Sequence, residues 1–302
     1  MSMGLPGRMK RRGVNKRCIL LPAVLLFLLP LAACRENSAE AGESNETVKN
    51  KEQENNEEQA ASSAQDPVFS DPVLLQALTD LPDEIRRQIE ERPAYFIQLV
   101  TTFLKGPEDY YILVDKSHPL PASYYPDDLV QLDKHPFVLN KQGLTLRRGV
   151  VPDLLAMAES ARAEGISLPI SSTFRSYEYQ EKVFQYNVEQ LGEQQAKRES
   201  AEPGKSQHQL GTTIDFGSIT PAFADTEAGK WLEEYAGEYG FSLSYPEGFE
   251  DITGYMHESW HYRYIGRTGT RLEREFFSGI QQYMLEFIHE IRENGTSFSG
   301  GQ

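Results

Sequence analysis

The chain has 302 residues and a formal net charge of −15, with 45 acidic side chains against 30 basic ones. This balance argues against a nucleic-acid-binding protein, because nucleic-acid recognition needs a basic face. The length allows one sizeable core and a helical appendage. Of the two cysteines, Cys18 and Cys34, only the second would remain after removal of an N-terminal signal, so no internal disulfide is expected.

The N-terminus has the pattern of a bacterial export signal. Six basic residues lie among the first seventeen positions, and an apolar run over residues 19–29 follows them. This run is shorter than the roughly 20 residues of a membrane span, and its length suits the apolar part of a signal peptide. Leu31-Ala32-Ala33-Cys34 resembles the lipobox of bacterial lipoproteins. We expect a lipoprotein signal peptide over residues 1–33 and lipidation at Cys34, with an ordinary signal peptide as the alternative.

Two further segments precede the main folded part of the chain. Residues 34–66 are rich in Glu, Asn, Ser and Gln and contain no aromatic residue, so they cannot bury enough apolar surface to offset the entropy of ordering. This composition predicts a disordered acidic tether. Residues 67–108 are predicted to be a helical N-terminal segment of short pieces, because apolar residues recur near every 3.6 positions and Pro82 and Pro93 lie where helices would start or stop.

Short strands and helices are predicted to alternate irregularly after Tyr110. The pattern indicates helices over residues 152–163, 176–191, 230–239 and 271–292, and strands over residues 111–114, 166–173, 212–216, 241–245 and 260–264. No strict βαβ alternation is present, so we predict an α+β fold. We expect the main domain to cover residues 109–270 and to contain a small mixed or antiparallel sheet flanked by helices. A C-terminal helix and tail over residues 271–302 complete the chain.

One pair of motifs predicts a metal site on this sheet. Ser206-Gln-His208-Gln-Leu-Gly211-Thr-Thr-Ile-Asp215 is followed by Glu258-Ser-Trp260-His261. Two imidazoles and a carboxylate are the ligand set of a catalytic zinc site, which keeps an open position for water beside a general base. We expect His208, Asp215 and His261 to bind Zn2+ and Glu258 to be the base.

An exchange of roles between Asp215 and Glu258 remains open. His257 is adjacent to Glu258, and we expect it to be structural or to support the site from behind. Arg175 lies in Ser171-Ser-Thr-Phe-Arg175-Ser176, at an expected junction between a strand and a helix. A guanidinium there could hold a substrate carboxylate or the oxyanion of the reaction. Ser206 could hydrogen-bond substrate or cap its loop.

These motifs carry a family resemblance. Ser-x-His-x-x-Gly-x-x-x-Asp, then Glu-x-Trp-His, with an upstream Phe-Arg-Ser-x-x-x-Gln, resembles the zinc D-alanyl-D-alanine carboxypeptidases of peptidase family M15, in the vancomycin-resistance-type subfamily. The segment from Leu113 to Val130 is also similar to that subfamily, and the likeness spans about residues 110–266. Thr213 and Phe174 depart from the residues often found there, Ala and Tyr.

The resemblance implies a fold, a cofactor and a set of roles. His208, Asp215 and His261 would bind zinc, Glu258 would be the catalytic base, and Arg175 would stabilise the substrate or transition state. By the same matching, Ser206 and Gln180 would contact the peptide substrate.

The expected function is a zinc carboxypeptidase, anchored by lipid at the bacterial cell envelope, that removes the C-terminal D-alanine of peptidoglycan stem peptides. Three alternatives remain: an L,D-carboxypeptidase acting on tetrapeptide stems, a zinc endopeptidase, and a non-catalytic wall-binding lipoprotein. The presence of Glu258 argues against the last, because a purely structural zinc site needs no base.

Overall fold

The protein is represented by a computed structural model that describes residues 71–295. The expected signal peptide, the lipidation site at Cys34 and the tether lie outside the described residues. Within residues 71–295, none of the helices combines the length and the apolar character that crossing a bilayer requires.

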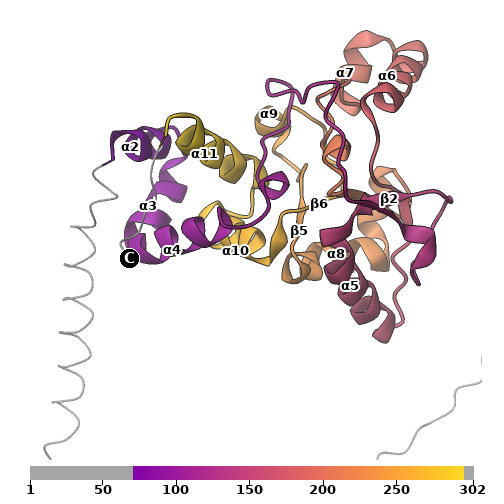
Figure 1. The fold of residues 1–302 in the computed structure, drawn as a ribbon, viewed down its shortest axis with the longest axis horizontal. Coiled ribbons are helices and arrows are strands. Elements are labelled where there is room, and N and C mark those ends of the chain that lie inside the picture. Colours follow the sequence, from indigo (N-terminus) through magenta and orange to yellow (C-terminus); the bar gives the residue numbers. More distant parts are fainter. Residues whose placement is uncertain (1–70, 296–302) are drawn as a thin grey trace, which may run out of the picture. The chain divides into compact units, whose positions relative to one another are not determined.

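A four-stranded antiparallel sheet forms the centre of the fold (Figure 1). The strands lie in the order β3-β4-β6-β5, with bounds Ile170–Ser172 for β3, Thr213–Phe216 for β4, His261–Tyr264 for β6 and Phe241–Leu243 for β5. A separate two-stranded sheet pairs β1 (Leu129–Gln131) with β2 (Thr145–Arg147). The predicted α+β class is confirmed, and the main sheet is antiparallel throughout.

The two central strands are buried on both faces, and their alternation separates two kinds of side chain. One face is apolar and packs with residues of α5 (Val151–Ala163) and α8 (Glu227–Tyr235) in a shared core; it comprises Ile214, Phe216, Tyr262 and Tyr264. The opposite face carries the polar set Thr213, Asp215, His261 and Arg263. The predicted site residues therefore lie on a sheet face that is polar and also buried.

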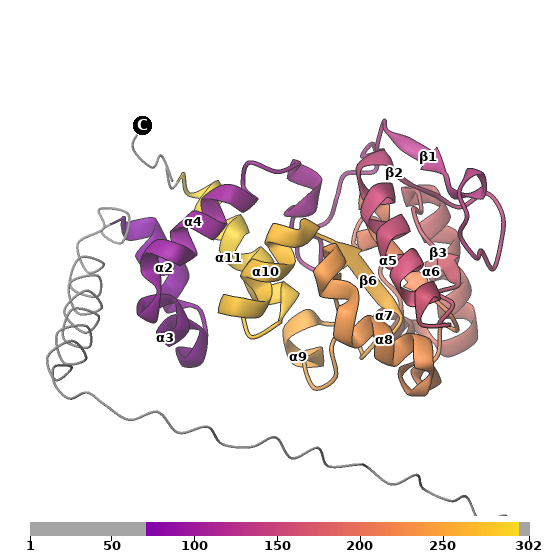
Figure 2. The same cartoon turned by 90° about the horizontal axis from the view of Figure 1, so that it is seen from below.

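A second core lies in a helical group formed by both ends of the described chain (Figures 1 and 2). Its N-terminal members are α2 (Pro72–Thr79), α3 (Asp83–Glu91) and α4 (Pro93–Phe103), which confirms the prediction of short helices here. Its C-terminal members are α10 (Gly266–Phe276) and α11 (Gln281–Glu293). Phe96 of α4 lies at the centre of this core, with its ring 5.1 Å from that of Phe276 and 5.5 Å from that of Phe287.

The prediction of one continuous helix over residues 271–292 is wrong, because the chain breaks between α10 and α11. Ser278 and Gly279 adopt positive φ angles of 55° and 72°, a left-handed conformation that ends an α-helix. The break allows Phe276, Phe277 and Phe287 to converge on Phe96 from two helices.

The predicted strand over residues 111–114 is also wrong. Leu113 and Val114 are buried, but no strand among the described residues pairs with them. The guanidinium of Arg263 takes the place of a partner strand, because its Nη2 donates to the carbonyl of Ile112 at 2.8 Å.

Other predicted elements are found with altered bounds. The helix of residues 176–191 is α6 (Tyr177–Leu191), capped by Ser176, and the strand of residues 166–173 shortens to β3. The helix of residues 230–239 is α8 followed by a 3-10 turn. Neither α7 (Glu193–Glu199), α9 (Glu250–Thr253) nor the β1–β2 hairpin is predicted from the sequence.

The packing around Phe96 yields a stability prediction. Phe96 is fully buried, so Phe96→Ala removes its ring from a core that can close the resulting cavity only in part. We expect a loss of about 3–5 kcal/mol in the free energy of unfolding, measured by urea titration. Leu75→Ala on neighbouring α2, where the side chain is 48% exposed, should change it by no more than about 0.5 kcal/mol. Equal losses for the two variants would contradict this packing.

The buried carboxyl of Glu273 predicts a pH dependence of stability. Burial raises the pKa of Glu273 from 4.5 to about 8, although Ser242 Oγ donates to its Oε1 at 2.7 Å. Between these two pH values the unfolded chain has released a proton that the folded protein keeps, so this residue's contribution to stability falls as the pH rises. Glu273→Gln should therefore gain in Tm relative to wild type from pH 5 to 8. The exposed Glu293→Gln is the control, and a constant Tm difference for Glu273→Gln would refute the assignment.

Candidate metal centre

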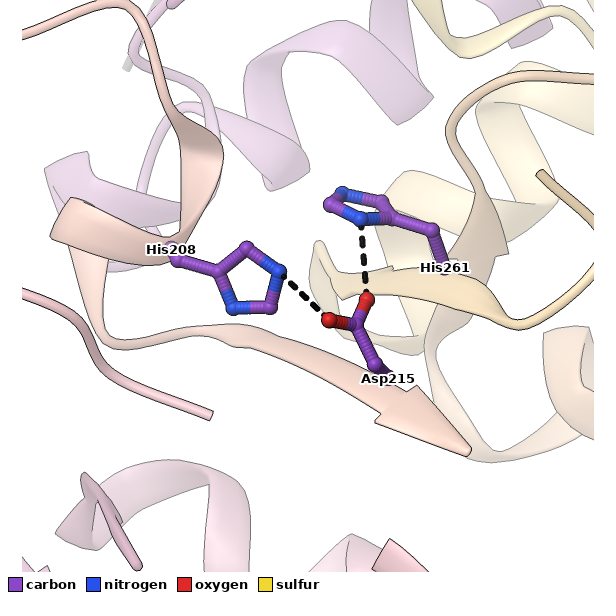
Figure 3. A group of neighbouring side chains, drawn as sticks. All are labelled: His208, Asp215 and His261. Atoms are coloured by element: carbon purple, nitrogen blue, oxygen red, sulfur yellow. Dashed lines mark ion pairs between the residues drawn. The ribbon is translucent and has the colours of Figure 1, made fainter. Parts of the chain in front are cut away.

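His208, Asp215 and His261 converge as the sequence predicted (Figure 3). Their three candidate ligand atoms lie within 4.8 Å of one another, and all three residues are buried. Nε2 of His208 lies 3.1 Å from Oδ2 of Asp215, and Nδ1 of His261 lies 3.1 Å from Oδ1 of the same carboxylate. Asp215 thus presents one oxygen to each imidazole.

Each of these side chains is placed by a different element. Asp215 on β4 and His261 on β6 are direct cross-strand partners, so the sheet register puts them on the same face. His208 belongs to the 3-10 helix Gln207–Leu210, which ends at Gly211 in a left-handed conformation with φ 73°. A Cβ at Gly211 would lie only 3.0 Å from the Arg147 side chain, so glycine suits both the left-handed conformation and the narrow space at this turn.

The hydrogen bond of His208 determines which of its nitrogens can bind a cation. Nδ1 lies 2.6 Å from the carbonyl oxygen of Thr173, which can only accept, so Nδ1 carries the proton. Nε2 then presents its lone pair toward Asp215 and Arg175. Burial, together with the nearby charge of Arg175, lowers the pKa of His208 to about 4, so the ring is neutral at pH 7.

Asp215 has an oxygen that suits a cation. Asp215 is ionised, because Nη2 of Arg175, which carries a permanent positive charge, donates to its Oδ2 at 2.8 Å. Its Oδ1 is buried and accepts no hydrogen bond of good geometry from the described residues, although Nδ1 of His261 is 3.1 Å away. An unpaired buried carboxylate oxygen among imidazole nitrogens is a donor set that zinc accepts readily.

Glu258 lies beside this group rather than within it. Its Oε2 is 3.4 Å from Nδ1 of His261, and Asp215 is the carboxylate that contacts both histidines. Burial and the charge of Asp215 raise the pKa of Glu258 to about 8, and Arg175 opposes this shift. A divalent cation at the three donors would lower this pKa by Coulomb attraction.

Arg175 follows β3 and reaches the donor atoms themselves. Its Nη2 donates to Oδ2 of Asp215 at 2.8 Å and lies 2.9 Å from Nε2 of His208. Ser172 Oγ accepts from Nε, and Gln180 Oε1 accepts from Nη1, both at 3.1 Å. Each of the three nitrogens of the guanidinium thus donates a hydrogen bond to the protein. Gln180, which is buried, also donates to the carbonyl of Ala201 at 2.7 Å, so its amide orients Arg175.

The group opens into a pocket of about 630 Å³. Its polar lining includes Arg175, Ser206 and Glu258, and its walls include Tyr179 and Val183 from α6 together with Tyr245, Tyr255 and Trp260. Gln180 does not line this pocket. His257 lines a different cavity of about 310 Å³, so it lies apart from the metal-binding group.

Two contacts of the site were not predicted from the sequence. The Thr173 carbonyl belongs to the backbone, and no sequence pattern marks it. Ser172 lies within the motif around Arg175 and could have been found from its place two residues before Phe174, on the strand that leads to the guanidinium.

Known proteins resemble this chain over the segment that contains the site. Residues 143–267 match the family described as VanY, D-alanyl-D-alanine carboxypeptidase. The putative carboxypeptidase YodJ of Bacillus subtilis (strain 168) is 35% identical over 187 residues, which cover 60% of this chain and 68% of that protein. The bifunctional D-Ala-D-Ala dipeptidase and D-Ala-D-Ala carboxypeptidase VanXYC of Enterococcus gallinarum is 31% identical over 191 residues, or 59% of this chain and 92% of its own length.

Among solved structures, that of the LD-carboxypeptidase LdcB is similar to this chain with a TM-score of 0.51 and 33% identity. The alignment covers 56% of this chain and 85% of LdcB. The matched family segment contains His208, Asp215, His261 and Glu258. The chain therefore belongs to the VanY family of D-alanyl-D-alanine carboxypeptidases, within peptidase family M15.

Proposed function

We propose that this protein is a zinc-dependent carboxypeptidase that removes the C-terminal D-alanine from peptidoglycan stem peptides. The observation that carries the proposal is the buried group of two imidazoles and one carboxylate, open to a pocket that also holds Glu258 and Arg175. Membership of the VanY family supports the reaction class, and the names of the related carboxypeptidases support D-Ala-D-Ala peptides as substrates.

Zinc would be held by Nε2 of His208, a carboxylate oxygen of Asp215 and Nδ1 of His261. Three protein ligands of this kind are typical of catalytic zinc sites, in which a further position is left for water or substrate. When bound, the ion would supply Lewis-acid polarisation of the scissile carbonyl and a lower pKa for the attacking water.

The residues of the chain supply binding and proton transfer. The Glu258 carboxylate takes a proton as water adds to the carbonyl carbon, and it returns that proton to the departing amine as the C–N bond breaks. Arg175 contributes a fixed positive charge for the substrate carboxylate or for the negative oxygen that forms during addition. The Ser206 hydroxyl lines the same pocket and can hydrogen-bond the peptide.

A second substrate specificity, for L,D bonds, is also supported by a comparison with a solved structure. The similarity to the LD-carboxypeptidase LdcB, at 33% identity, favours an L,D-carboxypeptidase that acts on tetrapeptide stems. Both reactions would use the same metal donors, and the difference lies in the stereochemistry of the residue before the scissile bond.

We further propose that the enzyme acts at the cell envelope. The signal-like sequence over residues 1–33 and the lipobox-like Leu31-Ala32-Ala33-Cys34 favour export and lipid anchoring at Cys34, and residues 34–66 would serve as the tether. The division into a helical segment over residues 67–108, a peptidase domain over residues 109–270 and a C-terminal part over residues 271–302 belongs to the same proposal.

Metal binding should depend on the three proposed ligands. Purified wild-type protein should bind one zinc ion per chain, measured by atomic absorption after dialysis. His208→Ala and Asp215→Ala should each abolish stoichiometric binding, because two remaining donors hold zinc poorly.

The matched control for the ligand variants is His257→Ala, a nearby histidine that lines a different cavity. This variant should bind zinc as wild type does. Loss of zinc from His257→Ala, with retention in His208→Ala, would mean that the ligand set is assigned incorrectly.

Activity and specificity are tested together by D-alanine release. Zinc-loaded protein is mixed with defined pentapeptide and tetrapeptide stems, and we expect release from the pentapeptide. Glu258→Gln should reduce kcat by about 10²–10⁴-fold, because it removes general acid–base catalysis while keeping the size of the side chain. Release only from the tetrapeptide would establish the L,D specificity. Release from neither would contradict the carboxypeptidase proposal and favour an endopeptidase or a wall-binding role.

A further inference from the structure

Gln207, the residue just before the proposed ligand His208, has a side chain that does not line the active-site pocket. The side chain of Gln207 is 2% exposed, and its amide lies against the ring of His261. Its Oε1 is 3.3 Å from Nε2 of His261, the ring nitrogen opposite the one that faces Asp215. A buried amide therefore contacts the outer side of a proposed ligand.

The chemistry of this contact assigns the proton of His261. If Nδ1 binds a cation, it must offer a lone pair, so the neutral ring carries its proton on Nε2. That N–H needs an acceptor, and Gln207 Oε1 is the acceptor within reach. Ligating histidines commonly donate their other N–H in this way, which orients the ring and raises its basicity.

Gln207 is itself held from several directions. Ser244 Oγ donates to its Oε1 at 2.7 Å, and the Ser244 backbone N–H donates to the carbonyl of His261 at 3.2 Å. Thr213 Oγ1 donates to the backbone carbonyl of Gln207 at 3.1 Å. Thr213 is the position at which the sequence departs from the alanine often found in related proteins, and the hydroxyl gives this chain an additional tie to Gln207.

The amide also connects the site to the helical group. Gln207 Nε2 donates to Oε1 of Gln281 at 3.3 Å, and Gln281 is the first residue of α11. The apolar residues that follow it on α11, among them Met284 and Ile288, are buried in the helical core. The packing of that core thus sets the position of the oxygen that orients the Gln207 amide.

Burying the Gln281 amide costs free energy, because one of its polar groups stays unpaired. This cost favours a role for Gln281 in its hydrogen bond with Gln207. Nε2 of Gln281 is buried and has no hydrogen-bond partner within residues 71–295. Turning the amide over would place two NH2 groups against each other, so Gln281 keeps its oxygen toward Gln207 and leaves its own donor unpaired. An apolar residue at this position would avoid the cost.

We propose that Gln207 is a positioning residue that holds the Nδ1 lone pair of His261 toward the metal, and that Gln281 couples this arrangement to the helical group. The inference rests on the proposed function, since it takes His261 as a zinc ligand. It assigns to α11, which lies outside the segment that matches the VanY family, a contribution to metal affinity.

The test measures zinc affinity by competition with a chromophoric chelator, using the full chain. Gln207→Met removes the acceptor at similar size and should weaken zinc binding by about 10- to 100-fold. Gln207→Glu keeps an acceptor for His261 and should restore affinity to near the wild-type value. Gln281→Met should give an intermediate loss.

The matched control is Gln282→Met, which removes a neighbouring buried amide of α11 that hydrogen-bonds to Asp115 and Glu286 instead. It should lower the Tm without changing zinc affinity. Nitrogen chemical shifts of the histidine rings in zinc-loaded protein should show His261 bound through Nδ1 in wild type and in Gln207→Glu.

The outcomes separate the two proposals. Wild-type zinc affinity in Gln207→Met would overturn the positioning role of Gln207. Equal losses of affinity in Gln281→Met and Gln282→Met would overturn the coupling through Gln281. Either result would leave the proposed carboxypeptidase activity intact. If Gln207→Met does not fold, Gln281→Met against Gln282→Met decides the question. Absence of zinc binding by the wild-type protein would overturn the proposed function itself.

Discussion

The register of β4 against β6 is the constraint on which the rest of this structure depends. Asp215 and His261 are direct cross-strand partners, and Ser172 of β3 is opposite Asp215 on the other side. Opposed side chains on one face of an antiparallel pair lie about 4.5–5.5 Å apart at Cβ, which is suitable for two ligands of one ion. A slip of one residue would turn Asp215 to the other face of the sheet.

The apolar face of the sheet is what maintains this register. Ile214 pairs with Tyr262, and these side chains pack with α5 and α8. Any other pairing would expose them or bury polar groups in their place, at a cost in transfer free energy for each side chain. The hydrophobic effect on one face therefore positions the proposed metal ligands on the other.

A buried polar face also needs partners, and the chain segments around the sheet provide them. Arg263 is fully buried, and its Nη2 donates to the carbonyls of Asp109 and Ile112, which ties the segment before the first sheet to β6. Its Nε and Nη1 have no hydrogen-bond partner in the described part of the chain, and leaving these buried donors unpaired costs free energy. The helical group joins the same face through Gln281 and Gln207. Segments that are far apart in the chain thus contact one another at the polar side of the sheet.

The amino-acid sequence alone determined the candidate ligand types, their order and the α+β class, because spacing and residue chemistry are local properties. The short helices α2, α3 and α4 were also predictable, since Pro82 and Pro93 and the apolar period mark their bounds. Only the tertiary structure decided that residues 111–114 do not form a strand. The carbonyl of Ile112 accepts a hydrogen bond from the side chain of Arg263, which is 151 residues away in the chain. The tertiary structure likewise decided the break between α10 and α11, which depends on two helices packing around Phe96.

The roles of Gln180 and Gln207 belong to the tertiary structure for the same reason. The family resemblance predicts that Gln180 contacts the substrate, and in the structure its amide contacts Arg175 and the carbonyl of Ala201. Gln207 lies between two motif residues, yet its partners are 54 and 74 residues away in the chain. A sequence specifies which groups can donate or accept, but which of them meet is settled by the packing that brings distant elements together.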